Sequence, residues 1–412
     1  MKVAIVHNTY QQPGGEDVVF AAEKELLRTA GHQVVEYTRD NREISSYGFW
    51  SRAALAARTV WARDSHREIR ALLARERPDL AHFHNTFPLI SPAAYYACRE
   101  ARVPVVQSLH NSRLVCPALT FQREHRVCQD CLGKKFAWPS VFHRCYRGSR
   151  TQTGVLAAMV AIHRQLKTWE RLVDCYIVFS EFYRRKFVEA GLPAEKIVVK
   201  AHFVEDHGVR QTAGSYALLV GRLAVEKGIG TLLKAWRGLH HIPLMIRGEG
   251  PLLQEAQQLS RESGGTVQLV PRLDRHELFA LMQGARFLVW PSEGYYETFG
   301  CVAAEAFSCG VPVITSRIGV NEEIVRDGGT GLHFTPGDHG DLATKVEWAY
   351  SHPREMEAMG REARAEYEAK YTSERNYRIL MDIYGKVTAV AKRDQDRESS
   401  WRDEECWAFP RG

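Results

Sequence analysis

The sequence has no long apolar run, few cysteines and little net charge, and each shortage excludes a class of protein. In its 412 residues the longest apolar stretch, VLAAMVAI at 155–162, is far too short to cross a bilayer. Nine cysteines in this length are too sparse for a small secreted domain that is stabilised by disulfides. The sequence opens directly into the strand-like segment KVAIVHN and shows no secretory signal pattern. We therefore expect a cytoplasmic protein.

The composition is that of an ordinary globular enzyme, with 45% apolar and 25% charged residues. A chain of 412 residues exceeds the size of one typical core, so two domains are expected. The net charge of +6 is unevenly spread, because residues 1–205 hold 30 Lys and Arg against 20 Asp and Glu. A basic half can face a phosphate-bearing substrate, nucleic acid or an anionic membrane, or it can simply solvate a surface.

Short apolar segments alternate with helical segments along the chain. This alternation predicts an α/β fold, in which helices cover both faces of parallel sheets. The segments lie at 2–7, 32–38, 78–85, 103–111, 175–180 and 197–203 in the first half, and at 216–221, 242–248, 266–270, 287–291 and 311–316 in the second.

A polar break, EDHGVRQTAGS at 205–215, separates two such series and predicts two doubly wound, Rossmann-like domains. Ligands of open α/β sheets bind at the carboxyl ends of the strands, so we expect a site in a cleft between the sheets, built from loops that follow strands. The predicted parts are an N-terminal domain over 1–205 with a cysteine-containing loop at 116–145, a C-terminal domain over 206–370, a closing helix at 371–390 and a disordered charged tail at 391–412.

Two loops of the second series are candidates for binding an anion. Arg222 and Lys227, in RLAVEKG, leave a predicted strand beside a glycine turn, where a guanidinium fork and an ammonium suit a diphosphate. The alternative is two solvated surface cations. Gly250, in GEGP, ends a Gly-x-Gly turn that lets a ligand approach the backbone, but taken by itself this short motif fits a plain tight turn better.

The stretch EGYYETFGCVAAEAF places two carboxylates eight positions apart, Glu297 and Glu305. Thr298 is predicted to cap a helix that starts near Phe299 and ends at Gly310. The free amides at such a helix start attract an anion, and carboxylates bind vicinal hydroxyls. A ligand with hydroxyls at both ends and phosphates between them, such as a nucleotide sugar, fits this layout.

These residues carry a resemblance to a known family. GRLAVEKG, ETFGCVAAEAFSCGVPVI and NEEIVRDGGTGL together resemble the nucleotide-sugar domain of the family 4 retaining glycosyltransferases, which have the two-Rossmann GT-B architecture. PGGED and SLHN resemble motifs of the first domain of that family. The resemblance extends to about residue 385, and its motifs are specific in combination.

The resemblance implies a retaining transfer from a UDP- or GDP-sugar that needs no catalytic metal, and it implies roles for single residues. Arg222 and Lys227 would bind the donor diphosphate, and Glu305 the ribose. Glu297 would hold the donor sugar, assisted by the amides of Phe299 and Gly300. His110 would lie near the reacting sugar, while Gly14 and Gly15 would let the first-domain loop approach phosphate and acceptor. The sequence departs from the family pattern in the longer lead-in SEGYYETFG and at Val320, where a glycine is common.

Four cysteines are grouped in one loop, at Cys116, Cys128, Cys131 and Cys145. The Cys-x2-Cys pair flanked by two further thiols suits a structural tetrahedral zinc site. Free thiols, a redox pair and an iron–sulfur cluster are the alternatives, and His125 and His143 are substitute ligands.

An arginine-rich stretch at 50–76 interleaves aromatic and basic residues at helical spacing. Such a helix can lie on an anionic membrane, which would suit a lipid-linked acceptor. The alternative is a helix whose apolar face packs on the core.

The function that fits best is a glycosyltransferase that moves a sugar from a nucleotide sugar to a glycan or lipid-linked hydroxyl, in cell-surface polysaccharide or glycan biosynthesis. A sugar-nucleotide epimerase of similar fold is the second enzyme class. A zinc-bearing nucleic-acid module is the non-enzymatic alternative, which the double α/β plan disfavours, so we expect no nucleic-acid partner.

Overall fold

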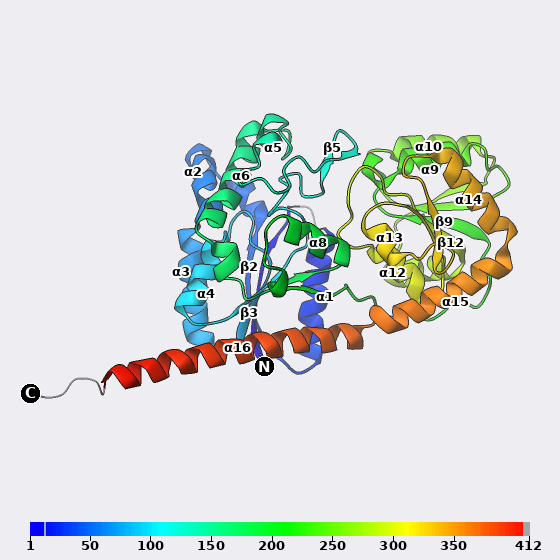
Figure 1. Cartoon of the computed structure of the whole chain (residues 1–412). Coiled ribbons are helices and arrows are strands. Elements are labelled where there is room, and N and C mark those ends of the chain that lie inside the picture. The colour runs from blue at the N-terminus through cyan, green and yellow to red at the C-terminus, as the bar shows by residue number, and fades with distance from the viewer. Residues whose placement is uncertain (12–13, 407–412) are drawn as a thin grey trace, which may run out of the picture.

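Two α/β domains, each built on a six-stranded parallel sheet, make up the fold (Figure 1). A computed structural model describes residues 1–11 and 14–406, with the backbone alone for 49–53 and 394–406. The strand orders are β2-β1-β3-β4-β7-β8 and β11-β10-β9-β12-β13-β14. The strands of the first sheet are β1 (Lys2–Thr9), β2 (Gln33–Asp40), β3 (Leu80–Asn85), β4 (Val105–Ser108), β7 (Cys175–Val178) and β8 (Ile197–Val199), and those of the second are β9 (Tyr216–Val220), β10 (Leu244–Arg247), β11 (Val267–Val270), β12 (Ala285–Trp290), β13 (Val313–Ser316) and β14 (Gly331–Phe334).

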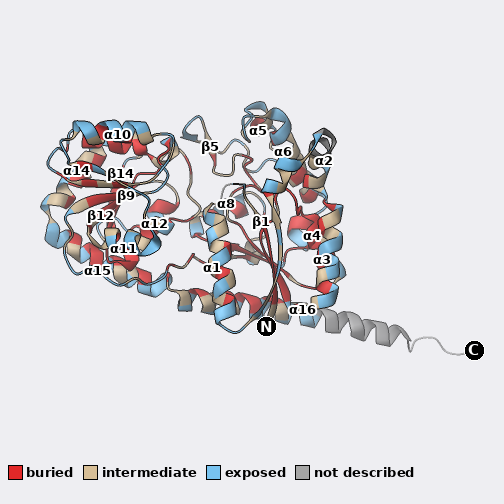
Figure 2. Ribbon diagram, turned by 180° about the vertical axis from the view of Figure 1, so that it is seen from behind, coloured by how far each residue is buried: buried red, intermediate tan, exposed pale blue. Residues whose placement is uncertain are grey.

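The strands are apolar because helices cover both faces of each sheet. All six residues of β3 are buried, as are six of the eight in β1. Such near-continuous burial is typical of parallel sheets. It explains why these strands appear in the sequence as continuous apolar segments. Figure 2 shows buried strands at the centre of each domain and exposed helix faces around them.

Helices connect the strands and flank the sheets. In the first domain they are α1 (Gly15–Thr29), α2 (Phe49–Val60), α3 (Arg63–Glu76), α4 (Ala93–Glu100), α5 (Trp138–Phe142), α6 (Arg150–Gln165), α7 (Thr168–Arg171) and α8 (Glu181–Glu189). In the second they are α9 (Ile229–Trp236), α10 (Leu253–Glu262), α11 (Arg275–Gln283), α12 (Cys301–Ser308), α13 (Val320–Ile324) and α14 (His339–Ser351).

The end of the chain returns to the first domain. Helix α15 (Pro353–Lys370) packs on the second domain, and α16 (Ser373–Cys406) then runs along the first (Figure 1). The side chain of Thr372 caps α16, because its hydroxyl accepts a hydrogen bond from the amide of Arg375 at 3.3 Å. Leu380, Ile383 and Tyr384 of α16 are buried in an apolar cluster that also contains residues of both sheets.

The secondary structure differs from the sequence predictions at several places. The helical stretch at 50–76 is two helices, and the second, α3, begins at Arg63 with Asp64 in its first turn, where a carboxylate is favoured. The predicted closing helix begins at Ser373, after the break at Tyr371. Strand β14 and the hairpin of β5 (Gln122–Arg123) and β6 (Arg126–Val127) in the cysteine loop were not predicted.

The tail that the sequence predicted to be disordered is helical as far as Cys406. Helix α16 continues through 391–406, and residues 407–412 lie outside the described residues. The stretch from Lys386 to Cys406 contains no glycine or proline and is rich in Arg, Glu, Lys and Gln, so its intrinsic helix propensity is high. Within the described residues, every helix is too short or too polar to cross a membrane.

Candidate functional site

A cavity of about 430 Å³ lies where loops that follow strands of the two sheets meet. Its volume is within the range of small-molecule sites. The polar side chains in its wall come from both domains and from the segment between them. They are Glu16 and His110 from the first domain, His202 from the linker, and Arg222, Lys227, Ser292, Glu297 and Thr298 from the second.

The second-domain wall is organised around the carboxylate of Glu297. Glu297 accepts a charge-assisted hydrogen bond from Lys227 and another from the hydroxyl of Ser292 at 2.9 Å. Burial alone would raise the pKa of Glu297, but the ammonium of Lys227 outweighs burial and lowers it. Glu297 is therefore an anion in the cavity wall with its charge already paired.

Arg222 is the accessible cation of this wall. It follows β9, and its side chain is 63% exposed while paired with Glu226 four residues on. An exposed ion pair of this kind contributes little stability, so the guanidinium can exchange its partner for a ligand.

Helix α12 begins two residues later than predicted. Its N-cap is Gly300, so Thr298 does not cap it, and Phe299 precedes the helix. Burial raises the pKa of the thiol of Cys301, the first residue of the helix, and the nearby carboxylates of Glu305 and Glu297 each raise it further. The two carboxylates thus flank the start of α12, as the sequence predicted.

Glu305 is held in an apolar setting, because its neighbours Ala304 and Ala306 are fully buried. Burial raises the pKa of Glu305 to about 7, against a weak opposing effect of Arg275. Glu305 itself does not line the cavity, although Cys301, one helical turn before it, does.

Of the four predicted glycines, Gly300 lines the cavity, and the other three have different surroundings. Gly15 lines the cavity, and Gly14 is the N-cap of α1 outside the lining. Gly250 does not reach the cavity wall. A Cβ at Gly250 would lie 2.5 Å from the carbonyl oxygen of Leu223, so this glycine permits close contact between two protein loops. The plain-turn interpretation of GEGP therefore describes this position.

His110 forms the first-domain wall opposite Glu297. Its Nε2 lies 3.0 Å from Nδ1 of His84, and its ring stacks on His202 with centroids 5.8 Å apart. Burial lowers the pKa of His110 well below its usual value, and His84 and His202 add to the effect. His110 is therefore a neutral imidazole at pH 7.

Sequence reasoning missed Glu16, which directly follows the glycine pair. Its Oε2 accepts hydrogen bonds from the hydroxyl of Tyr10 at 2.9 Å and from the amide of Asn111 at 3.3 Å. Burial raises the pKa of Glu16 to about 7, although Arg113 opposes the shift. The rule that site residues follow strands extends to Glu16, since it stands in the first turn of α1, the helix that follows β1. His202 was missed because nothing in the sequence marks it as facing a cavity.

The four cysteines of the loop line one small cavity of about 10 Å³, the space of about one water molecule. Burial raises the pKa of Cys116 to about 12 and that of Cys145 to about 11. Among the described residues, the ligand-type group whose donor atoms all lie within 4.8 Å of one another is Glu23, His82 and His84, and the cysteines do not form such a group. The four cysteines therefore surround one small cavity, but their sulfur atoms do not all lie within 4.8 Å of one another.

The same loop contacts the second domain beside Glu297. The backbone amide of Tyr296 donates to the carbonyl of Thr120 at 3.1 Å, and the side chain of Gln129 donates to the hydroxyl of Tyr296 at 3.0 Å. A Cβ at Gly294 would lie 2.1 Å from the carbonyl oxygen of His125, so the backbones approach closely. The cysteine loop therefore braces the segment that carries Glu297.

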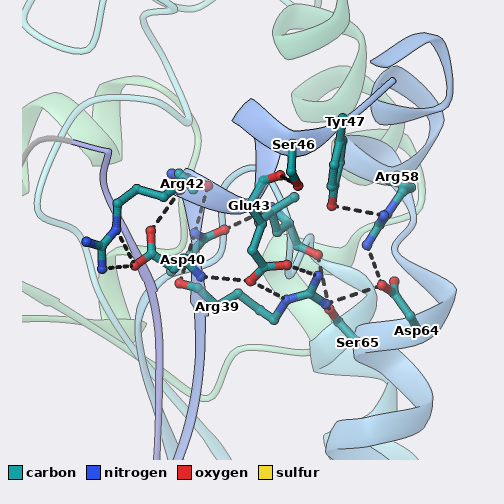
Figure 3. Close-up of polar contacts among 12 residues, drawn as sticks. Arg39, Asp40, Arg42, Glu43, Ser46, Tyr47, Arg58, Asp64 and Ser65 are labelled. Atoms are coloured by element: carbon teal, nitrogen blue, oxygen red, sulfur yellow. Dashed lines mark hydrogen bonds and ion pairs between the residues drawn. The ribbon is translucent and has the colours of Figure 1, made fainter. Parts of the chain in front are cut away.

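The arginines near α2 and α3 are partly engaged within the fold. Arg58 pairs with Asp64 and donates to the hydroxyl of Tyr47, while Arg39 bonds Glu43 and Asp64 (Figure 3). Helix α3 buries Ile69 and Leu73, as the core-packing alternative predicted. Trp50 and Arg52 lie among the residues whose side chains the structure does not describe.

The sequence is similar to those of known glycosyltransferases. A D-rhamnosyltransferase of Pseudomonas aeruginosa is 31% identical over 170 residues, which are 41% of this chain and 44% of the relative. The chain spans about half the length of the curated relatives it matches.

Solved structures show the same fold at low sequence identity. A sucrose-phosphate synthase of Thermosynechococcus elongatus superposes with a TM-score of 0.68 at 19% identity, covering 94% of this chain and 99% of that one. The Anabaena protein HepE in complex with UDP superposes with a TM-score of 0.63 at 19% identity, covering 93% of this chain and 100% of that one. Both likenesses support the GT-B arrangement of the two domains.

Family models cover most of the chain. The model described as Glycosyltransferase Family 4 matches residues 13–206, and the model described as Glycosyl transferases group 1 matches residues 207–366. The two matches divide the chain at the segment between the two sheets, and together they show that it belongs to the group 1, family 4 glycosyltransferases.

Proposed function

We propose that the protein transfers a sugar from a UDP-sugar to a hydroxyl group of a glycan or lipid-linked acceptor, with retention of anomeric configuration and without a catalytic metal. One observation carries the proposal. Arg222, Lys227 and Glu297 of the second domain face His110 of the first across a single cavity. The UDP bound by the HepE relative favours UDP over GDP as the nucleotide.

The cavity wall suggests how the donor lies. Arg222 and Lys227 would bind the diphosphate and offset the charge that develops on the leaving group. Glu297, with the amides at Phe299 and Gly300, would hold the sugar. Glu305, which stands one helical turn beyond the wall residue Cys301, would accept hydrogen bonds from the two ribose hydroxyls at the edge of the cavity. In the transfer, the bond from the anomeric carbon to the phosphate oxygen breaks, and the acceptor oxygen bonds to that carbon. The departing phosphate takes the acceptor proton.

The acceptor would approach along the first-domain wall, by Gly14, Gly15 and Glu16. A carboxylate there disfavours a phosphate and suits a neutral hydroxyl. Cell-surface polysaccharide or glycan biosynthesis is the process that fits such a reaction. Nothing in the comparisons or in the described residues supports the epimerase or nucleic-acid interpretations.

We also propose a structural zinc ion in the cysteine loop. The donor set, four thiols around one cavity, is that of a closed zinc site, with His143 beside it. Cys116, Cys128, Cys131 and Cys145 would hold the ion as thiolates, so binding would release protons and draw the sulfurs together. Zinc would then stiffen the loop that braces Tyr296.

The first prediction concerns the diphosphate. UDP should stabilise the wild-type protein against heat in a saturable way, and Arg222→Ala should abolish most of the shift because it removes the accessible cation. Since Arg222 is largely exposed, this variant should fold normally. Arg237→Ala, at an exposed arginine of the same domain, is the matched control and should retain the full shift. A full UDP shift in Arg222→Ala would exclude this donor site.

The second prediction separates binding from turnover. Glu297→Ala should lower the release of UDP from a UDP-sugar panel by about 100-fold, because contacts to the reacting sugar act mainly in the transition state. Its affinity for UDP itself should change far less. If Glu297→Ala lowers UDP release and UDP affinity by the same factor, Glu297 does not have the proposed sugar-binding role.

The third prediction follows from the pKa of Glu305, about 7. The ribose hydroxyls favour the carboxylate, so ionisation and UDP affinity should rise together as pH rises through 7. From pH 6 to pH 8 the ionised fraction goes from ~10% to ~90%, so the ratio of wild-type to Glu305→Gln affinity should grow by up to about tenfold. Calorimetric titration of both proteins cancels the titration of UDP itself. A constant ratio would show that Glu305 does not contact the nucleotide.

The fourth prediction tests the metal. Purified protein should contain one zinc per chain by elemental analysis, and Cys128→Ser with Cys131→Ser should lose it and lower the melting temperature. Cys301→Ser, at a thiol outside the loop, should keep the zinc. Wild-type protein that takes up no zinc after reduction and incubation with the metal would rule the site out.

The fifth prediction concerns a peripheral membrane contact through residues 50–76, which we propose for a lipid-linked acceptor. Arg63 and Arg67 are exposed, and neither forms an ion pair within the described part of the chain. The protein should sediment with phosphatidylglycerol vesicles in a salt-sensitive manner, and Arg63→Glu with Arg67→Glu should weaken this. The control Arg237→Glu should not. If Arg63→Glu with Arg67→Glu sediments as well as the control Arg237→Glu, the proposed membrane contact is excluded.

A further inference from the structure

A chain of buried polar side chains leads from His110 into the first domain. Behind His110 lie His84 and His82 of β3 and Glu23 of α1, each at most 2% exposed. Nδ1 of His84 lies 3.0 Å from Nε2 of His110, so one of these two nitrogens carries a proton. Which of them does so decides what His110 presents to the cavity.

Glu23 is an anion, although it is buried. Its Oε2 accepts a hydrogen bond from the ammonium of Lys200 at 2.9 Å, and Lys200 also donates to Asn376 of α16 at 3.0 Å. Burial alone would raise the pKa of Glu23, but Lys200 and His82 outweigh burial and hold it well below its usual value. An ionised carboxylate only accepts hydrogen bonds.

The other oxygen of Glu23 lies near two ring nitrogens. Oε1 of Glu23 is 3.1 Å from Nδ1 of His82 and 3.8 Å from Nε2 of His84, and this nitrogen of His84 is buried without a hydrogen-bond partner among the described residues. An N–H at Nε2 of His84 is attracted by the carboxylate of Glu23, whereas a lone pair there is repelled by it. The proton is therefore on Nε2 of His84.

The proton on His84 fixes the state of His110. Burial lowers the pKa of both imidazoles, so each ring carries a single proton. With its proton on Nε2, His84 offers a lone pair at Nδ1, and Nε2 of His110 must donate to it. Nδ1 of His110 then has a lone pair, and no hydrogen bond from a described residue reaches that atom.

A buried metal ion is the competing explanation. The donor atoms of Glu23, His82 and His84 all lie within 4.8 Å of one another. However, the ammonium of Lys200 already neutralises Glu23, and a divalent cation so close to it would be strongly repelled. His82 is also engaged on both nitrogens, by the hydroxyls of Tyr384 at 2.7 Å and Ser108 at 2.9 Å.

We propose that Glu23 is a positioning residue that, through His84, holds His110 in the tautomer protonated at Nε2, so that Nδ1 of His110 accepts a hydrogen bond from a ligand hydroxyl in the cavity. A lone pair at this point disfavours a phosphate oxygen and selects a sugar or acceptor hydroxyl. The identity of the ligand rests on the proposed function, whereas the tautomer does not.

Nitrogen NMR of the histidine rings tests the proposal without any substrate. In protein labelled with 15N-histidine, two-bond and three-bond proton–nitrogen correlations distinguish the two neutral tautomers, the imidazolium and a metal-bound nitrogen. His84→Gln and His110→Gln assign the signals. Between pH 6 and pH 8, both rings should be neutral and protonated at Nε2.

Variants of α1 test whether Glu23 sets this state. Glu23→Gln can donate as well as accept, so the signals of His84 and His110 should shift toward a mixture of tautomers. Glu25→Gln, at an exposed position of the same helix, is the matched control and should leave them unchanged. Unchanged tautomers in a folded Glu23→Gln variant would overturn the proposal.

The wild-type spectrum tests the proposed tautomers of His84 and His110 even if the Glu23→Gln variant does not fold. A proton on Nδ1 of His110, or an imidazolium at pH 7, would overturn the proposal. So would one bound metal per chain with a metal-shifted His84 nitrogen.

Kinetics then test the link to function. Glu23→Gln should lower UDP release from a UDP-sugar by about tenfold while leaving UDP affinity unchanged, as expected for a weakened hydrogen bond to the reacting ligand. Equal kcat values for Glu23→Gln and wild type would contradict the role of the tautomer. If UDP does not bind the wild type at all, the proposed function fails, while the NMR result stands by itself.

Discussion

The buried ion pair of Lys200 and Glu23 is the interaction on which the first domain most depends. Lys200 stands at the end of the first sheet, directly before the segment that leads to the second domain, and Glu23 lies on α1. Asn376 links helix α16 to this ion pair, because its side chain accepts a hydrogen bond from Lys200 and donates one to the carbonyl of Ala201. Removing one partner of a buried pair costs about 3–5 kcal/mol, since the other charge remains unpaired. One contact thus secures a sheet edge, a helix, the linker and the returning chain end.

The second constraint is that the two domains hold each other close to the reaction site. Tyr296 is bound by Thr120 and Gln129 from the cysteine loop, and Tyr183 donates to its carbonyl at 3.1 Å. On the same side, Glu323 of α13 accepts from the two first amides of α8 at 2.7 and 2.8 Å, so one domain caps a helix of the other. These contacts bear on the loop that ends at Glu297, which explains why a rigid cysteine loop would matter for catalysis.

The fold was largely predictable, because parallel strands covered on both faces are apolar throughout and stand out in the sequence. The missed strand β14, with sequence GLHF, is short and follows a glycine-rich motif, so its pattern resembles a turn. For the charged tail, composition suggested disorder, whereas the absence of glycine and proline between Lys386 and Cys406 favours the helix that the structure has there. The break after Val60 falls where Asp64 pairs with Arg58 of the preceding helix and with Arg39 of β2, and these pairings leave no periodic signal.

Site residues were predictable where position alone determines their role, and not where the role depends on pairing. Arg222, Lys227, Glu297 and His110 each follow a strand and reach the cavity for that reason. Gly250 also follows a strand, yet its space is filled by another loop.

In the proposed arrangement the state of His110 depends, through His84, on Glu23, which lies 87 positions earlier, and sequence order does not disclose such a relation. The two walls of the cavity therefore differ in a way that only the folded chain reveals. One offers cations with a paired carboxylate, and the other offers neutral imidazoles and a carboxyl group that titrates near 7. A ligand with a charged and an uncharged end has a single favourable orientation between them, phosphates toward the second domain and hydroxyls toward the first.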